Sequence, residues 1–105
     1  MHIQIVNFHL KGLSHNDYAK ACEEVFGPAF TQVDGLLSKI WLANAETNTY
    51  GGIYTWKDKA AMLAFQQTDL FRSVLSNPNL SGLSSVDFSV LEVPTRMTRG
   101  IALAA

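Results

Sequence analysis

Residues 39–58, KIWLANAETNTYGGIYTWKD, decide the fold. Two runs rich in β-branched and aromatic residues lie at either end, and polar, turn-prone residues join them. Such residues suit the pleated surface of a sheet, so the stretch predicts a central β-hairpin with strands at 36–42 and 50–56. Asp58 is a typical helix N-cap, so we expect a helix to begin directly after the hairpin.

Gly51 and Gly52 interrupt the second strand of this hairpin. Glycine within a strand often marks a bulge or a place where something large approaches the backbone. We therefore expect one or the other here, with Trp41 across the hairpin as a candidate neighbour. The pair does not form a phosphate-binding loop, because the lysine and the helix start that such a loop needs are absent from the motif.

The chain before the hairpin predicts one strand and one helix. Residues 2–10 predict a strand whose apolar side chains fall on both faces. Ser14 is typical of a helix N-cap, and apolar residues then recur at spacings of three and four as far as Phe30. Gly27-Pro28 lies within this stripe and predicts a kink or a restart of the helix.

The helix that begins at Asp58 is expected to be interrupted. Its first apolar face covers residues 61–65, and a second apolar group follows at residues 70–75. Thr68-Asp69 between them predicts a break.

The remaining residues predict a loop, a strand and a tail. Residues 77–81 predict a loop. Alternating apolar and polar residues from Ser85 onward predict a fourth strand that reaches about Val93, where Pro94 ends it. Residues 95–105 show no strong pattern and are expected to be a C-terminal tail.

The element order is therefore β-α-β-β-α-β. It predicts an α+β fold of the ferredoxin-like type, with a four-stranded antiparallel sheet and two helices on one face. Residues 1–94 would form this domain, because 105 residues leave no room for a second core. The strands carry apolar residues on both faces, so we expect a homodimer in which two sheets cover each other face to face.

Composition excludes several classes of function. A net charge of −1 without clustered basic residues argues against a nucleic-acid partner. The single cysteine, Cys22, excludes an intramolecular disulfide and a cysteine-rich zinc site. The sequence contains no apolar run of membrane-spanning length and no leader pattern, so no membrane partner and a cytoplasmic location are expected.

The hairpin resembles the signature of the YdhR-like mono-oxygenase family. The matching residues are Lys39-Ile40-Trp41, Glu46-Thr47, Gly51-Gly52-Ile53-Tyr54 and Asp58. The similarity extends more loosely from Phe26-Gly27-Pro28 to the fourth strand, while the second helix and the tail diverge. The resemblance implies a dimeric α+β barrel and a likeness to small mono-oxygenases that use no cofactor.

Oxygenation without a metal or flavin requires a substrate that supplies the electrons, such as a deprotonated phenol or polyketide. The protein then needs a mostly apolar pocket with a few polar groups. The candidate substrate-binding residues are Asn7, His9, Trp41, Tyr54, Trp56 and Phe65. Each also has a structural interpretation, because strand aromatics usually belong to a core and a lone strand-end histidine is usually a surface residue.

No cofactor and no metal are expected. His2, His9 and His15 include no helix-spaced pair, and none lies in the second helix, where haem-degrading relatives of this fold place their iron ligand. Two functions remain open. One is a cofactor-independent mono-oxygenase that acts on a small aromatic or polyketide-like compound. The alternative is a non-catalytic dimer that binds a small ligand.

Overall fold

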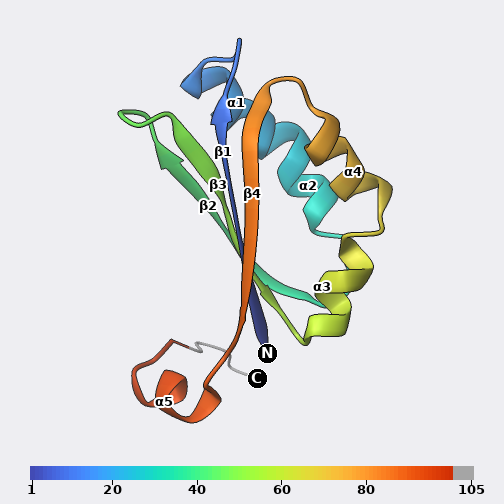
Figure 1. The fold of residues 1–105 in the computed structure, drawn as a ribbon, viewed down its shortest axis with the longest axis vertical. Coiled ribbons are helices and arrows are strands. Elements are labelled where there is room, and N and C mark those ends of the chain that lie inside the picture. The colour runs from blue at the N-terminus through green and yellow to red at the C-terminus, as the bar shows by residue number, and fades with distance from the viewer. Residues whose placement is uncertain (101–105) are drawn as a thin grey trace.

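A computed structural model describes residues 1–100. Four strands form one antiparallel sheet in the order β2-β3-β1-β4, with helices between them (Figure 1). The strands are β1 (His2–Leu10), β2 (Leu36–Asn44), β3 (Thr49–Trp56) and β4 (Leu80–Ser89). This order and the helices between the strands define the ferredoxin-like fold, so the predicted fold class is confirmed.

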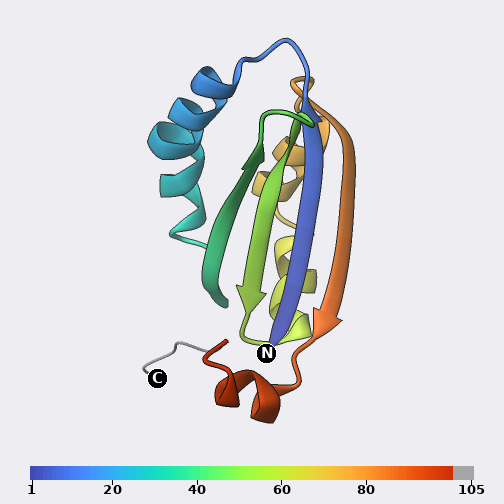
Figure 2. The same ribbon diagram turned by 90° about the vertical axis from the view of Figure 1, so that its left-hand side faces the viewer.

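Two interrupted helices cover one face of the sheet (Figures 1 and 2). The first consists of α1 (His15–Ala21), the π-helical turn η1 (Cys22–Phe26) and α2 (Gly27–Phe30). The second consists of α3 (Lys59–Phe65) and α4 (Asp69–Ser76). Side chains cap the starts of three of these segments, at Ser14, Asp58 and Thr68, and the break predicted at Thr68-Asp69 is confirmed.

The expected irregularity at Gly27-Pro28 takes the form of the turn η1. The Gly27 N–H bonds to the Cys22 carbonyl, and a Cβ at Gly27 would lie 2.8 Å from that oxygen. In a regular α-helix, Tyr18 and Phe30 would point about 120° apart. A π-helical turn accommodates one extra residue, so both rings are buried against the sheet.

Aromatic rings fill the space between this face and the helices. Trp56 is fully buried and contacts Tyr54 and Phe65, with ring centroids 5.9 Å and 5.1 Å away. Gln4 is also fully buried, and its Oε1 accepts a hydrogen bond of 3.1 Å from Trp56 Nε1. Its Nε2 donates to Ser85 Oγ, so both ends of this buried amide are satisfied.

The opposite face of the sheet carries no helix, and we call it the open face. The register places Ile40, Ile53, Ile5 and Val86 in one row across all four strands. Phe88 lies beside this row and is 57% exposed, while Ile40 is 58% exposed. The prediction that the strands carry apolar residues on both faces is confirmed.

Strand β4 differs from its predicted bounds. It begins at Leu80 and ends at Ser89, because pairing with β1 extends as far as Leu10 opposite Leu80. Residues Glu92–Met97 form the short helix α5, in which Pro94 lies in the first turn, where the missing N–H costs nothing. The predicted boundary between residues 94 and 95 stays a prediction, and residues 101–105 of the predicted tail lie outside the described residues.

The second helix buries Ala61, Phe65 and Phe71 as predicted, but it differs from the prediction at Leu63. Leu63 is 47% exposed, and Met62 is buried in its place. The short segments α3 and α4 each pack their own apolar face, in agreement with the predicted break between them. Among residues 1–100, no helix has the length and apolar character that crossing a membrane requires.

The bulge predicted at Gly51-Gly52 is wrong, and the alternative, a close approach to the backbone, is found. The nearest groups are the backbone of β1 at Gly51 and the Lys39 stem at Gly52, not the expected Trp41. The register of β3 is continuous through both glycines. Gly51 has φ of 151°, and a Cβ there would lie 1.8 Å from the Val6 carbonyl oxygen. No other residue fits this position without moving β1.

Gly51→Ala should therefore lower the free energy of unfolding by at least about 3 kcal/mol, because both strain and a backbone clash result. The control is Gly12→Ala, which also changes a positive-φ glycine but whose Cβ would meet nothing closer than 3.7 Å. That control should cost about 1–2 kcal/mol. Urea unfolding of both variants tests this, and equal losses would contradict the close-approach interpretation.

Candidate functional site

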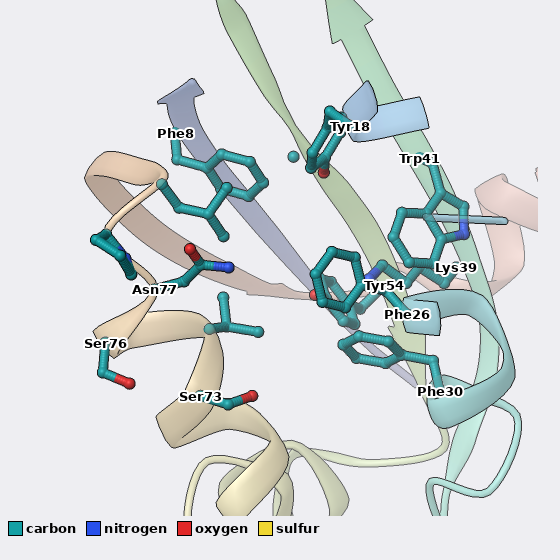
Figure 3. A pocket seen from close by; sticks show the side chains of 14 residues that line it. Phe8, Tyr18, Phe26, Phe30, Lys39, Trp41, Tyr54, Ser73, Ser76 and Asn77 are labelled. Carbon is teal, nitrogen blue, oxygen red and sulfur yellow. The ribbon is translucent and has the colours of Figure 1, made fainter. Parts of the chain in front are cut away.

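A cavity of about 280 Å³ lies between the sheet, the first helix and the junction of α4 with β4 (Figure 3). Its walls are mainly aromatic and aliphatic. The apolar lining residues are Phe8, Tyr18, Phe26, Phe30, Trp41, Gly51, Tyr54, Val74, Pro78 and Leu80. The polar ones are Lys39, Ser73, Ser76 and Asn77. A planar apolar compound with one or two polar groups matches such a lining.

Lys39 is the cationic side chain of this lining. Its Nζ lies 3.4 Å from the ring centroid of Phe30, 3.5 Å from that of Trp41 and 4.6 Å from that of Tyr54. Rings at these distances attract an ammonium group through their negative faces. The lysine is therefore held by aromatic rings from β2, β3 and α2.

Burial lowers the pKa of Lys39 from 10.5 to about 7. Within residues 1–100, no carboxylate forms an ion pair with this lysine to oppose that effect. The aromatic contacts favour the ammonium form and burial favours the amine, so both forms are accessible near neutral pH.

Gly52 explains how the lysine reaches the rings. A Cβ at Gly52 would lie 2.9 Å from Lys39 Cε. Because glycine leaves this space empty, the lysine stem lies over β3 beside Tyr54, its partner in the register.

The other titratable groups near Lys39 are neutral at neutral pH. Burial is the main cause that raises the pKa of Tyr18 and the pKa of Tyr54. Burial also raises the pKa of the Cys22 thiol, which lies on η1. Among the described lining residues, Lys39 therefore controls the charge of the cavity.

The wall formed by α4 and the following loop offers one free donor. The hydroxyls of Ser73 and Ser76 donate to carbonyls of their own helix, at 2.6 Å and 2.9 Å. Asn77 Oδ1 accepts a hydrogen bond of 2.9 Å from the Asn79 N–H. The amide nitrogen of Asn77 donates to no group within residues 1–100 and points into the cavity (Figure 3).

The structure brings together two of the six predicted site residues. Trp41 and Tyr54 both line the cavity. Trp56 and Phe65 lie behind the cavity in the buried core, where Trp56 is tied to Gln4. Their place in substrate binding stays a prediction.

Asn7 and His9 lie on the open face and do not line this cavity. The period of two along β1 places Phe8 on the helix face and its two neighbours on the other. His9 is exposed, with Nδ1 2.7 Å from the Asn48 carbonyl oxygen in the hairpin turn. Asn7 Nδ2 donates weakly to the Tyr50 carbonyl at 3.4 Å. Both contacts hold backbone segments together.

Several lining residues were not predicted as site residues. Tyr18 and Phe30 belong to the predicted apolar stripe of the first helix, but only the π-helical turn shows that both reach the same cavity. Asn77 lies in a stretch, NPN, that the sequence marks only as a loop. Of these lining residues, Lys39 has the clearest signal in the sequence for a place in the site, because it lies on the same strand face as Trp41.

A second hollow lies beside the first, between α1 and β2. Tyr18 and Trp41 line both hollows. Further along its wall, the Tyr50 hydroxyl lies 2.7 Å from His15 Nδ1. Within residues 1–100, no three His, Cys, Asp or Glu side chains converge as a metal site would require.

The geometry defines a ferredoxin-like domain with an aromatic cavity between its sheet and helices. The family described as "Putative mono-oxygenase ydhR" matches residues 3–101. The chain belongs to this family. No curated protein matches the chain in sequence.

Solved structures share the fold at low sequence identity. A "putative antibiotic biosynthesis monooxygenase" from Deinococcus radiodurans has a TM-score of 0.68 at 15% identity, covering 86% of this chain and 92% of its own. A monooxygenase from the gene ActVA-Orf6 of Streptomyces coelicolor, in complex with nanaomycin D, has a TM-score of 0.64 at 18% identity, covering 85% and 86%. A mutant of MhuD with two manganese protoporphyrin IX molecules per active site has a TM-score of 0.68 at 17% identity, covering 87% and 95%.

The lowered pKa of Lys39 makes the stability of the protein depend on pH. Between pH 7 and about 10, the unfolded chain binds more protons at this lysine than the folded protein does. The free energy of unfolding should therefore rise with pH relative to that of Lys39→Met, by at most about 1.4 kcal/mol per pH unit.

Urea unfolding at several pH values measures this difference. The matched control is Lys11→Met, which removes an exposed lysine. Its difference from the wild type should not change with pH. A constant difference for Lys39→Met as well would show that Lys39 titrates normally.

Proposed function

We propose that this protein is a cofactor-independent mono-oxygenase whose substrate is a small planar aromatic or polyketide-like compound. The observation that carries the proposal is the aromatic cavity, in whose wall Lys39 is surrounded by aromatic rings. Membership of the family supports the reaction class. The relative with the same fold that holds nanaomycin D supports the class of substrate.

The substrate supplies the electrons in this reaction. Loss of a proton from the hydroxyl of a phenol or enol, such as the enol form of an anthrone, gives a delocalised anion. A ring carbon of this anion uses the electron pair to form a bond to one atom of O₂, and the other oxygen atom takes up the proton. The resulting hydroperoxide loses water as the remaining C–H bond breaks. One oxygen atom ends in the new carbonyl group and the other in water, so the reaction balances without an external reductant.

The cavity matches a substrate of modest size. Its volume of about 280 Å³ is just below the usual range for small-molecule sites, which begins at about 300 Å³. A compound of a few fused rings, such as an anthrone, fits such a volume. Trp41 and Tyr54 offer ring faces to a planar substrate, and the Asn77 amide offers a donor to one of its oxygens.

Trp41→Ala should lower kcat/KM for such a substrate about tenfold or more, because the substrate loses one ring wall. Oxygen uptake with anthrones and related phenols measures this. The matched control is Leu75→Ala on α4, whose side chain is 53% exposed, and it should leave the rate unchanged.

Ligand binding without oxygen uptake in the wild type, across a broad set of such compounds, would contradict the mono-oxygenase proposal. It would favour the alternative of a non-catalytic ligand-binding protein.

We also propose that two copies pack through their open faces to form a dimeric α+β barrel. The row formed by Ile40, Ile53, Ile5 and Val86 crosses the whole sheet and would otherwise contact water. Leu91, Val93 and Met97, each more than 70% exposed, continue this apolar surface beyond the end of β4. Figure 1 shows α5 on the side of the sheet away from α2, α3 and α4.

Ile40→Glu should convert the dimer to a monomer, because it places a charge in the apolar row of each copy. Val25→Glu is the control, because Val25 is equally exposed, at 60%, but lies on the turn η1. Sedimentation at micromolar concentration measures the mass. A wild-type monomer, or a monomer produced by both variants, would contradict the proposed interface.

A further inference from the structure

We propose that Lys39 is the catalytic base of this cavity: its neutral amine removes the proton from an acidic hydroxyl of the substrate, and the resulting ammonium holds the oxyanion. The substrate class is therefore a planar phenol or enol rather than an aromatic hydrocarbon or an ether. This inference rests on the proposed function and names the group that begins its reaction.

The geometry around Lys39 supports the assignment. Nζ is surrounded by the rings of Phe30, Trp41 and Tyr54, and all four residues line the cavity. Among residues 1–100, no carboxylate neutralises it. An ammonium that is removed from water and lacks an anionic partner attracts an anion strongly, and the cavity is the space in which that anion can lie.

The other groups that face the lysine do not compete for this role. Tyr18 on α1 and Tyr54 on β3 are phenols whose pKa burial raises, and Cys22 on η1 is a thiol whose pKa burial also raises. The α4 side of the wall adds hydroxyl and amide groups that do not titrate. Near neutral pH, an amine with a pKa of about 7 is the group among these that can both take and keep a proton.

The step is a simple proton transfer. The substrate O–H bond breaks, its electron pair stays on oxygen, and the proton forms a bond to the lone pair of Lys39 Nζ. A neutral pair becomes an ion pair, with no net change of charge in the cavity. The rings stabilise the ammonium, and the ammonium stabilises the oxyanion, whose electrons are delocalised over the aromatic system that reacts with O₂.

The test uses para-cyanophenol, which is mainly protonated in water at pH 7 and whose phenolate has a distinct ultraviolet absorption. In the wild type, the bound compound should absorb as the phenolate. Lys39→Met should bind it about tenfold more weakly and only as the phenol, because the charge-assisted bond is lost. The methyl ether, para-methoxybenzonitrile, should bind both proteins equally.

Lys39→Arg keeps the positive charge of the side chain but removes its ability to accept a proton. Its guanidinium holds a phenolate but accepts no proton, so each bound phenolate should release one proton to the buffer. The wild type should release fewer, because Lys39 accepts part of them, and an indicator dye measures the difference. Lys11→Met should behave as the wild type does.

Binding of para-cyanophenol as the neutral phenol in the wild type would overturn the assignment of Lys39, as would the same phenolate spectrum in Lys39→Met. So would a lack of any spectral change at millimolar protein. These readouts need no turnover. A phenolate spectrum without oxygen uptake from any substrate would support Lys39 as the base and contradict the mono-oxygenase proposal. Oxygen uptake that Lys39→Met leaves intact would support the mono-oxygenase proposal and contradict the role of Lys39.

Discussion

The contact of Phe30 with its neighbours fixes the relative positions of sheet, helices and cavity. This ring, 5% exposed, lies 5.8 Å from Trp41, 5.7 Å from Tyr54 and 5.7 Å from Phe65, measured between centroids. It therefore joins β2, β3 and α3 to the end of the first helix. The π-helical turn η1 directs the ring of Phe30 toward the sheet, which a regular α-helix would not do. This irregular turn is therefore needed to form the cavity.

The chemistry of the cavity follows from the same ring. Phe30 and Trp41 hold the Lys39 ammonium at nearly equal distances, while the helices remove it from water. Glycine at position 52 leaves the space that its stem needs. A cation in an apolar cavity is costly unless a ligand compensates it, and this is why the lysine rather than the surrounding aromatics defines the substrate.

The sequence predicts the sheet well, because alternation, caps and the hairpin are local signals. It also places Trp41 and Tyr54 in one site, since both lie on the same face of the hairpin. It does not separate them from Trp56, because burial depth depends on Gln4, a partner distant in the chain. The alternation of side chains along β1 is also a local signal, and it puts His9 on the face away from Phe8. The position of Asn77 beside the cavity depends on tertiary packing, which no local pattern encodes.

A crystal structure of the protein with bound para-cyanophenol tests the central claim most directly. The account predicts the compound in the cavity lined by Trp41 and Tyr54, with its phenolic oxygen within hydrogen-bond distance of Lys39 Nζ. A compound bound on the open face, or one whose oxygen points away from Lys39 toward solvent, would contradict it.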